Sequence, residues 1–349
     1  MGEMVAARLH GKEDLRVGKT EIPEVDSNEI LMKVEAATIC ASDIRAYIHG
    51  NGRVKLPKVL GHEFAGRIAK VGSGLKERFN VGTRITANPN MYCGRCYYCM
   101  QGKHELCRDR YALGVDVDGA FAEYLRIPKE AYHCGLIFEI PDTVSFEEAA
   151  LAEPLSACLH GQLFAPLRMG DIVTVIGAGP IGIMHIVLAK SMGASTIISC
   201  DINDQRLKQA KKFGADNVIN PKRENLEERI REITNRHGSD FTIVAVSSPK
   251  VQQDSLKIAA NEGRINFFGG LPPGEEHVPL NTNIIHYREL KVFGTFAQSI
   301  HEYAQALRFI GTKRYPIEKL ITHRYNLKDI DLAFKKAISQ EGLKICVNP

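Results

Sequence analysis

The sequence contains no tryptophan, and aromatic residues make up only 7% of its 349 positions. So small an aromatic content argues against an aromatic-lined platform for sugars or bases. Basic and acidic residues nearly balance at 45 and 41, and no run of Lys or Arg favours nucleic acid as a partner. Repeats and low-complexity segments are lacking, while 44% hydrophobic and 25% charged residues are typical of a globular protein. This length predicts two domains, or three.

The sequence gives little indication of secretion or of insertion into a membrane. Residues 1–15 carry several charges and lack the apolar core of a secretory signal. The stretch 172–189 is nearly uncharged and as long as a membrane span, but Gly177, Gly179 and Pro180 interrupt its centre. A buried strand, a turn and a helix explain it better, because irregular backbone is not tolerated in lipid. We therefore expect a cytoplasmic protein with no membrane segment, whose nine cysteines stay reduced.

The pattern of strands and helices changes along the chain. Residues 1 to about 150 have short strands between turns, whereas strands and helices alternate from about 170 to 270. Such alternation predicts a parallel, doubly wound sheet. The expected strands are 30–36, 66–71, 83–87, 172–177, 196–201, 218–220, 240–246 and 264–268, and the expected helices are 181–192, 204–213, 224–237, 249–261, 301–311 and 327–339.

A glycine-rich turn joins the strand 172–177 to the following helix. It reads Gly177-Ala178-Gly179-Pro180-Ile181-Gly182, and this strand–turn–helix context is typical of dinucleotide sites. Gly177 permits the turn, Gly179 lets a pyrophosphate approach the helix N-terminus, and Gly182 allows close packing of helix and strand. Asp201 ends the next strand and can accept both ribose hydroxyls, which favours NAD over NADP; Arg206 can contact adenine or phosphate. A tight turn without a ligand is the alternative.

Four cysteines lie close together between residues 93 and 107. Cys93, Cys96, Cys99 and Cys107 have the spacing C-x2-C-x2-C-x7-C, which suits a tetrahedral zinc site. Four thiolates leave no position for water, so the zinc would be structural. An iron–sulfur cluster or a metal-free loop are the alternatives.

Further candidate ligands are dispersed: Cys40, His62, Glu63 and Glu153. Each alone is ordinary, since a lone histidine is usually a satisfied polar residue and a lone cysteine a small buried hydrophobe.

The motifs taken together resemble the zinc-dependent medium-chain dehydrogenases, in the branch of polyol (sorbitol-like) and threonine dehydrogenases. The matching segments are Cys40-Ala41-Ser42-Asp43, Gly61-His62-Glu63-Phe64-Ala65-Gly66, the four-cysteine loop, Asp118-Gly119-Ala120-Phe121-Ala122-Glu123-Tyr124, Ala152-Glu153-Pro154-Leu155, the glycine turn and Tyr287-Arg288-Glu289-Leu290. They run nearly from end to end of the chain.

The resemblance implies roles for individual residues. Cys40, His62 and Glu63 would bind a catalytic zinc, and Glu153 would be a direct or exchanging fourth ligand. Ser42 would relay the proton of the substrate hydroxyl, while hydride passes to NAD. Besides the glycine turn, the residues expected at the cofactor are Asp201, Arg206, Phe268, Gly269, Thr295 and Phe296.

The resemblance also implies the architecture. We expect an α/β protein in which a GroES-like, β-rich catalytic domain, residues 1–152 and 292–349, encloses a Rossmann NAD-binding domain, residues 153–291. The active site would lie in the cleft between them. Relatives form dimers through sheet edges near residues 284–300, or tetramers, so a homo-oligomer is expected.

Four positions depart from the family pattern. Arg45 stands where relatives often have the last histidine of the proton relay, and a guanidinium cannot release a proton near neutral pH. Polyol dehydrogenases tend to have a tyrosine at position 46 and an Arg-Tyr pair at 297–298, where this chain has Ala46, Ala297 and Gln298. These differences argue against sorbitol itself and leave the alcohol or ketone substrate open.

The leading hypothesis is an NAD-dependent zinc enzyme for a secondary alcohol of a polyol, sugar derivative or hydroxy amino acid. A relative acting on a simple alcohol or aldehyde is disfavoured by Glu63 and Glu153, because such enzymes usually supply a second cysteine. A zinc-free quinone reductase is disfavoured because all candidate ligands are present. A catalytically silent binding protein on the same fold would be expected to have lost ligands.

Overall fold

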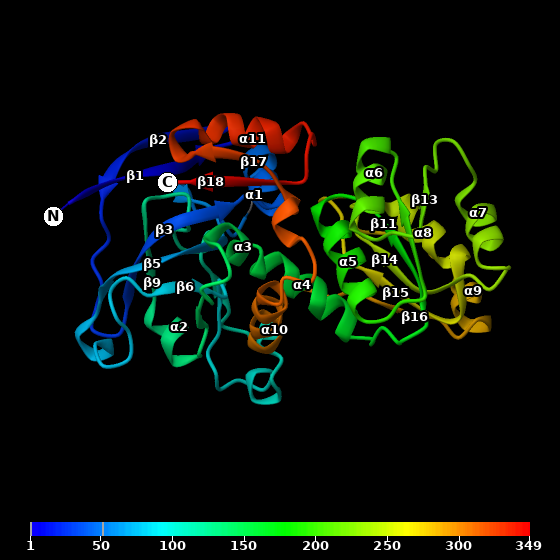
Figure 1. Ribbon diagram of the computed structural model, residues 1–349, viewed down its shortest axis with the longest axis horizontal. Coiled ribbons are helices and arrows are strands. Elements are labelled where there is room, and N and C mark those ends of the chain that lie inside the picture. The colour runs from blue at the N-terminus through cyan, green and yellow to red at the C-terminus, as the bar shows by residue number, and fades with distance from the viewer. Residues whose placement is uncertain (1, 51) are drawn as a thin grey trace. The chain divides into compact units, whose positions relative to one another are not determined.

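The computed structural model describes residues 2–50 and 52–349 of a chain that divides into two compact units. Unit 1 consists of the chain up to Ser156 together with Gln298–Pro349, and unit 2 is Ala157–Ala297. The sequence placed these boundaries after residues 152 and 291. In Figure 1, unit 1 contains both the blue and the red ends of the chain, and unit 2 is green to yellow.

Unit 1 is built on a seven-stranded sheet of order β10-β6-β5-β3-β18-β17, in which β9 also pairs with β3. Strands β2, β1 and β4 form a second sheet. The strands that follow unit 2 in the chain complete the large sheet, and Figure 1 shows red β18 beside blue β3. The elements are β1 (Glu3–Gly11), β2 (Asp14–Glu21), β3 (Ile30–Thr38), α1 (Ala41–His49), β4 (Lys58–Val59), β5 (Glu63–Val71), β6 (Arg84–Ala87), β7 (Asn90–Met91), β8 (Tyr111–Ala112), β9 (Tyr124–Ile127), α2 (Lys129–His133), β10 (Ile137–Glu139), α3 (Phe146–Ala150), α10 (Ile300–Gly311), β17 (Ile321–Asn326), α11 (Ile330–Ile338) and β18 (Lys344–Asn348). Helix α4 (Ala152–Leu163) begins in unit 1 and ends in unit 2.

The hydrophobic core of unit 1 contains residues that precede unit 2 in the chain and residues that follow it. Phe121 and Phe334 are fully buried, and their rings meet edge to face with centroids 5.9 Å apart. Gly66 in β5 lies so close to β3 that a Cβ would stand 2.0 Å from the carbonyl oxygen of Lys33. This close approach holds β3 and β5 in the register that brings Thr38 opposite Glu63.

Unit 2 contains the predicted doubly wound sheet, with six parallel strands in the order β13-β12-β11-β14-β15-β16. Its helices cover the sheet in pairs, since α5 contacts α6 and α7 contacts α8, and Figure 1 shows the strands between them. The elements are β11 (Ile172–Ile176), α5 (Pro180–Ser191), β12 (Thr196–Cys200), α6 (Asp204–Phe213), β13 (Asn217–Ile219), α7 (Leu226–Ile233), β14 (Ser239–Val244), α8 (Pro249–Ile258), β15 (Ala259–Phe267), α9 (Thr282–Tyr287) and β16 (Lys291–Phe293).

Two predicted helices are wrong at their C-terminal ends, and the helix expected over 224–237 stops at Ile233. The helix expected over 249–261 stops at Ile258, and Ala259 already begins β15. Ala259 lies opposite Ser239 in the parallel ladder of β14 and β15. Alanine favours helix locally, but this long-range pairing overrides the local preference.

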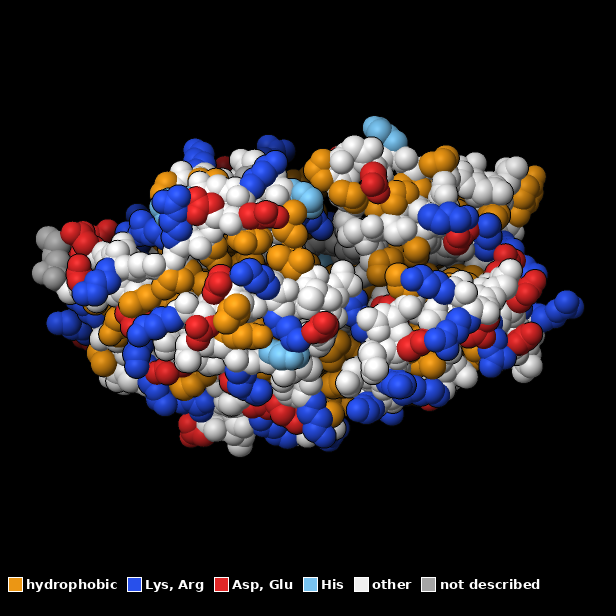
Figure 2. Space-filling model, turned by 90° about the horizontal axis from the view of Figure 1, so that it is seen from above, with side chains coloured by type: hydrophobic (Ala, Val, Ile, Leu, Met, Phe, Trp, Pro, Cys, Tyr) orange, Lys and Arg blue, Asp and Glu red, His pale blue; other side chains and the backbone are white. Residues whose placement is uncertain are grey.

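The longest apolar run of the sequence forms ordinary elements of unit 2. Within residues 2–50 and 52–349, no helix has both the length and the apolar character needed to cross a bilayer. The run 172–189 is β11, the glycine turn and most of α5, and α5 is largely buried. On the face seen in Figure 2, basic and acidic side chains are interspersed.

Candidate active site

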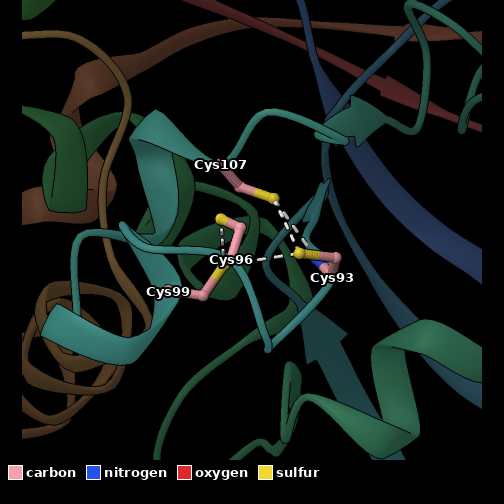
Figure 3. A group of neighbouring side chains, drawn as sticks. All are labelled: Cys93, Cys96, Cys99 and Cys107. Carbon is pink, nitrogen blue, oxygen red and sulfur yellow. Dashed lines mark hydrogen bonds between the residues drawn. The ribbon is translucent and has the colours of Figure 1, made fainter.

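The four-cysteine loop brings its four sulfur atoms together in unit 1. Turns at Gly94 (φ 69°) and Gly102 (φ 74°) reverse the chain in the left-handed region that favours glycine. The four Sγ atoms lie within 4.8 Å of one another, and Figure 3 shows the four side chains gathered together. The loop therefore assembles the cluster that the spacing predicts.

The sulfur positions fit a tetrahedral metal. Zinc–sulfur bonds of about 2.3 Å place the sulfurs of a tetrahedron about 3.8 Å apart. The observed separations are 3.5 Å for Cys96–Cys99, 3.5 Å for Cys93–Cys107 and 4.0 Å for Cys93–Cys99. All four positions belong to protein sulfur, so the site suits a structural zinc.

The protonation of these thiols differs from one to the next. Backbone amide groups of Cys99 and Arg108 lower the pKa of Cys96 to about 6. Burial raises the pKa of Cys99 and of Cys107. Cys96 therefore loses its proton more readily than Cys99 or Cys107, and a metal ion bound by all four would displace the remaining protons.

A second cluster joins Cys40, His62 and Glu63, whose ligand atoms also lie within 4.8 Å of one another. The sheet register explains the proximity. Thr38 at the end of β3 pairs with Glu63 at the start of β5, so Cys40, just beyond β3, faces the residues that open β5. Residues distant in sequence thus meet because two antiparallel strands end together.

Asp43 organises this cluster from the first turn of α1. Its Oδ2 accepts a hydrogen bond of 2.9 Å from the Cys40 amide, and its Oδ1 lies 3.4 Å from His62 Nδ1. Burial lowers the pKa of His62, but the negative charges of Asp43 and Cys40 outweigh burial and raise it well above its ordinary value. Surroundings that favour positive charge on His62 also favour a cation beside it. The sequence reasoning assigned no role to Asp43.

Glu63 is completely buried, and only one of its two carboxylate oxygens accepts hydrogen bonds. Its Oε2 accepts hydrogen bonds from Thr38 Oγ1 and Lys344 Nζ. Its Oε1 has no hydrogen-bond partner among the described residues. A buried carboxylate oxygen without a partner is costly, and a metal ion next to Cys40 and His62 would satisfy it. The donor set therefore fits zinc.

Lys344 was missed by the sequence reasoning. It opens β18, is 3% exposed, and its Nζ also donates to the carbonyl of Ile39 over 3.1 Å. Burial lowers the pKa of Lys344, but attraction to Glu63 more than offsets it, so that the pKa is raised. Lys344 thus braces both the backbone beside Cys40 and the carboxylate of Glu63.

Glu153 lies outside the group of three. It stands in the first turn of α4, is 9% exposed, and its Oε1 accepts a 3.1 Å hydrogen bond from Gln298 Nε2. The same amide lies 3.4 Å from Asn88 Oδ1. Burial raises the pKa of Glu153, and the charge of His62 opposes the rise. The role of Glu153 as an exchanging ligand therefore stays a prediction.

The predicted proton relay begins at an exposed hydroxyl. Ser42 is exposed in the first turn of α1, and its Oγ is 3.4 Å from His62 Nε2. Arg45, one helical turn further on, is exposed as well. The structure therefore places Ser42 beside His62, with Arg45 on the next turn of α1.

The predicted dinucleotide turn lies in unit 2, between β11 and α5. Gly177 has φ 105°, and no side chain caps the N-terminus of α5 at Gly179, so its first amides are open to an anion. Asp201 Oδ2 accepts a hydrogen bond of 2.7 Å from the amide of Ala178. Arg206 Nη1 lies 3.7 Å from where a Cβ of Gly179 would be. These features fit a bound pyrophosphate and ribose.

The other predicted cofactor residues follow β15 and β16. Phe268 and Gly269 come directly after β15, and Thr295 and Phe296 come shortly after β16. A Cβ at Gly269 would meet the carbonyl oxygen of Val246 at 2.5 Å. In an open parallel sheet, ligands bind at the carboxyl ends of the strands, where all four residues lie.

Comparison with known proteins agrees with this geometry. Residues 26–141 match the family described as Alcohol dehydrogenase GroES-like domain, and residues 180–312 match Zinc-binding dehydrogenase. A sorbitol dehydrogenase of Bacillus subtilis (strain 168) is 35% identical over 352 residues, covering 99% of this chain and 97% of that enzyme. An L-threonine 3-dehydrogenase of Idiomarina loihiensis is 30% identical, covering 98% of each. A structure from Sinorhizobium meliloti 1021, described as a zinc-binding dehydrogenase bound to NADP, has a TM-score of 0.93 and 31% identity, covering 100% of both chains.

Fold, metal clusters and relatives lead to one class, the oxidoreductases that combine zinc with a dinucleotide fold. The chain belongs to the zinc-dependent medium-chain dehydrogenase family, in the branch of polyol and threonine dehydrogenases. The predicted fold class, with a GroES-like and a Rossmann part, is confirmed, as is the prediction that the protein is an enzyme.

Proposed function

We propose that this chain is an NAD-dependent zinc dehydrogenase that interconverts a secondary alcohol and its ketone. Unit 1 is the catalytic domain and unit 2 the NAD-binding domain. The observation that carries the proposal is the cluster of Cys40, His62 and Glu63, with a buried, unpaired oxygen on Glu63, in a chain that has a separate four-cysteine cluster.

The residues of the chain have distinct roles in this proposal. Bound zinc lowers the pKa of the substrate hydroxyl, and bound nicotinamide accepts the hydride. Ser42 takes the hydroxyl proton and, being exposed, passes it to water, since Arg45 cannot act as the next station. Asp43 orients His62, and Gln298 holds the carboxylate of Glu153.

The proposed cofactor is NAD. The carboxylate of Asp201 lies at the end of β12, tied to the glycine turn through Ala178, where it would accept ribose hydroxyls and repel a 2′-phosphate. The Sinorhizobium meliloti structure contains NADP, so cofactor preference is the first property to measure.

The proposed substrates are polyols, sugar derivatives and 3-hydroxy amino acids. Relatives named sorbitol dehydrogenase and L-threonine 3-dehydrogenase support this class. Sorbitol itself is disfavoured because this chain has Ala46, Ala297 and Gln298 at positions where polyol dehydrogenases tend to have larger or charged residues.

We further propose a cytoplasmic homo-oligomer. Five cysteines belong to the two candidate zinc clusters, and a reducing compartment would keep these thiols available for a metal. Strand β16 lies at the edge of the sheet in unit 2, where a second copy can add its own edge to form a dimer, and a pair of dimers would give a tetramer.

A substrate panel with metal analysis tests the function. We expect about two zinc ions per chain and turnover of at least one polyol, keto-sugar or amino alcohol with NAD. His62→Ala should abolish turnover and leave about one zinc. Exclusive turnover of simple primary alcohols or aldehydes would favour the alternative dehydrogenase, and one zinc without any turnover would favour a silent binding protein. A clear preference for NADP would overturn the role of Asp201.

A further inference from the structure

Unit 2 has a buried amide side chain in an unusual place. Asn266 lies within β15, is completely buried, and is flanked in sequence by the apolar Ile265 and Phe267. Central strands of parallel sheets are normally apolar, because burying an amide costs free energy unless its hydrogen bonds are satisfied. The contacts of Asn266 therefore indicate what its amide does.

The first contact of Asn266 is with the end of a helix. Its Nδ2 donates a hydrogen bond of 3.1 Å to the carbonyl of Gly161, in the last turn of α4. Carbonyl groups in the last turn of a helix lack partners within the helix, so the amide satisfies one of them. A Cβ on Gly161 would stand 2.9 Å from this Nδ2 and 3.1 Å from the ring of Phe268. The glycine thus lets α4 approach the end of β15.

The second contact is with the segment that follows the neighbouring strand. Asn266 Nδ2 lies 3.1 Å from Thr295 Oγ1, two residues beyond the end of β16. Thr295 is half-buried, whereas Phe296 beside it is 55% exposed. One amide thus ties the segment after β16 to the end of α4.

A second buried group lies against the segment after β15. His185 of α5 is completely buried, and its ring meets Phe268 edge-on with centroids 4.7 Å apart. Its Nδ1 is 3.1 Å from Gln162 Nε2, so that α4 is also tied to α5. Both segments at the carboxyl ends of β15 and β16 therefore rest on α4 through buried polar side chains.

We propose that Asn266 is a positioning residue for the nicotinamide half of the dinucleotide. By fixing Thr295 against Gly161, its amide sets the wall against which the nicotinamide ring lies. The proposal rests on the proposed function, which places the cofactor at the carboxyl ends of the strands. Hydride transfer depends on the nicotinamide ring being held within a fraction of an ångström of its reacting position. The benefit of fixing the segment at Thr295 therefore offsets the free-energy cost of burying the Asn266 amide.

The test compares two ligands that differ only in nicotinamide. NADH and ADP-ribose are titrated calorimetrically into wild-type protein, Asn266→Ala and Thr295→Val. Loss of one hydrogen bond that orients the ring should weaken NADH about tenfold and ADP-ribose less than about twofold. The emission of bound NADH should move toward that of free NADH in both variants, and Thr295→Ser should restore wild-type values. The double variant should lose no more than either single variant, because both remove the same contact.

Each other outcome overturns a specific claim. Equal weakening of NADH and ADP-ribose would show that Asn266 only supports the fold, and unchanged NADH binding would show that Thr295 does not border the ring. If wild-type protein binds neither ligand, the proposed function itself fails. Thr174→Val serves as the control, since it removes a buried hydroxyl from β11 of the same sheet. Thr295→Val, at a half-buried position, keeps the test decisive if Asn266→Ala does not fold.

Discussion

Lys344 and Glu63, 281 positions apart in the chain, form an ion pair from which solvent is excluded. The pair fixes one oxygen of Glu63 and leaves the other without a partner. Lys344 also holds the backbone at Ile39, next to Cys40. Two of the three candidate zinc ligands are thus positioned by one lysine.

Substituting Lys344 should strongly destabilise the protein and weaken zinc binding. Lys344→Met leaves the Glu63 carboxylate buried without a counter-charge, which should lower the free energy of unfolding by about 3–5 kcal/mol. Urea denaturation and zinc analysis measure both consequences, and Lys344→Arg should recover part of the loss. Lys335→Met, at an exposed ion pair, is the control and should change stability by less than about 1 kcal/mol. A mild effect of Lys344→Met would mean that Glu63 does not depend on the pair.

Two glycines of the dinucleotide turn should respond differently to the same substitution. A Cβ at Gly182 would stand 1.7 Å from the carbonyl oxygen of Gly177, so Gly182→Ala should disrupt the turn and lower both thermal stability and NAD binding. At Gly179 the nearest neighbour is Arg206, 3.7 Å away. Gly179→Ala should keep wild-type stability but obstruct the pyrophosphate and weaken NAD at least about tenfold. Thermal melts and NAD titrations distinguish them; equal stability losses would contradict the separate roles.

The thiols of the four-cysteine loop should react at different rates once zinc is removed. Cys96, with a pKa lowered to about 6 by backbone amides, is mostly thiolate at neutral pH, whereas burial raises the pKa of Cys99. Iodoacetamide should therefore alkylate Cys96 at least about tenfold faster than Cys99. Mass spectrometry of the peptides measures both rates, and zinc-loaded protein should be protected. Uniform rates would show that the loop loses its geometry with the metal.

His185 should make unit 2 sensitive to acid. Burial lowers the pKa of His185 to about 3, so the folded protein keeps it neutral while the unfolded chain takes up a proton below its ordinary value of 6.5. The stability it contributes is complete above pH 6.5 and is lost as pH falls toward the folded pKa. Between about pH 7 and about pH 5 this loss is about 2 kcal/mol. Urea midpoints at both pH values should fall less for His185→Gln than for wild type, and equal falls would contradict the assignment. His286→Gln, at an exposed position, is the control.

Local spacing made much of the candidate site predictable. Cys93 and Cys107 belong to one loop whose candidate ligands are close in sequence. The glycine turn is recognisable from six consecutive residues between a predicted strand and a predicted helix. The dispersed set of Cys40, His62 and Glu63 came from resemblance to a family, because no short spacing links Cys40 to the others.

The residues that support the site could not be predicted in this way. Lysine in a sequence is normally taken for a surface residue, and the burial of Lys344 depends on β18 pairing between β3 and β17. Asn266 lies in a predicted strand, but its contacts with Gly161 and Thr295 form only because α4 and the segment after β16 both approach β15 in the fold. Such roles follow from tertiary contacts that leave no local pattern.

The discontinuous course of unit 1 predicts an order of metal loading during protein synthesis. The four-cysteine loop is complete once Cys107 has left the ribosome. The second cluster waits much longer: its ligands emerge early, but Lys344 emerges only after all of unit 2. We therefore expect the four-cysteine site to take up metal first and the cluster of Cys40, His62 and Glu63 to be completed when β18 joins the sheet.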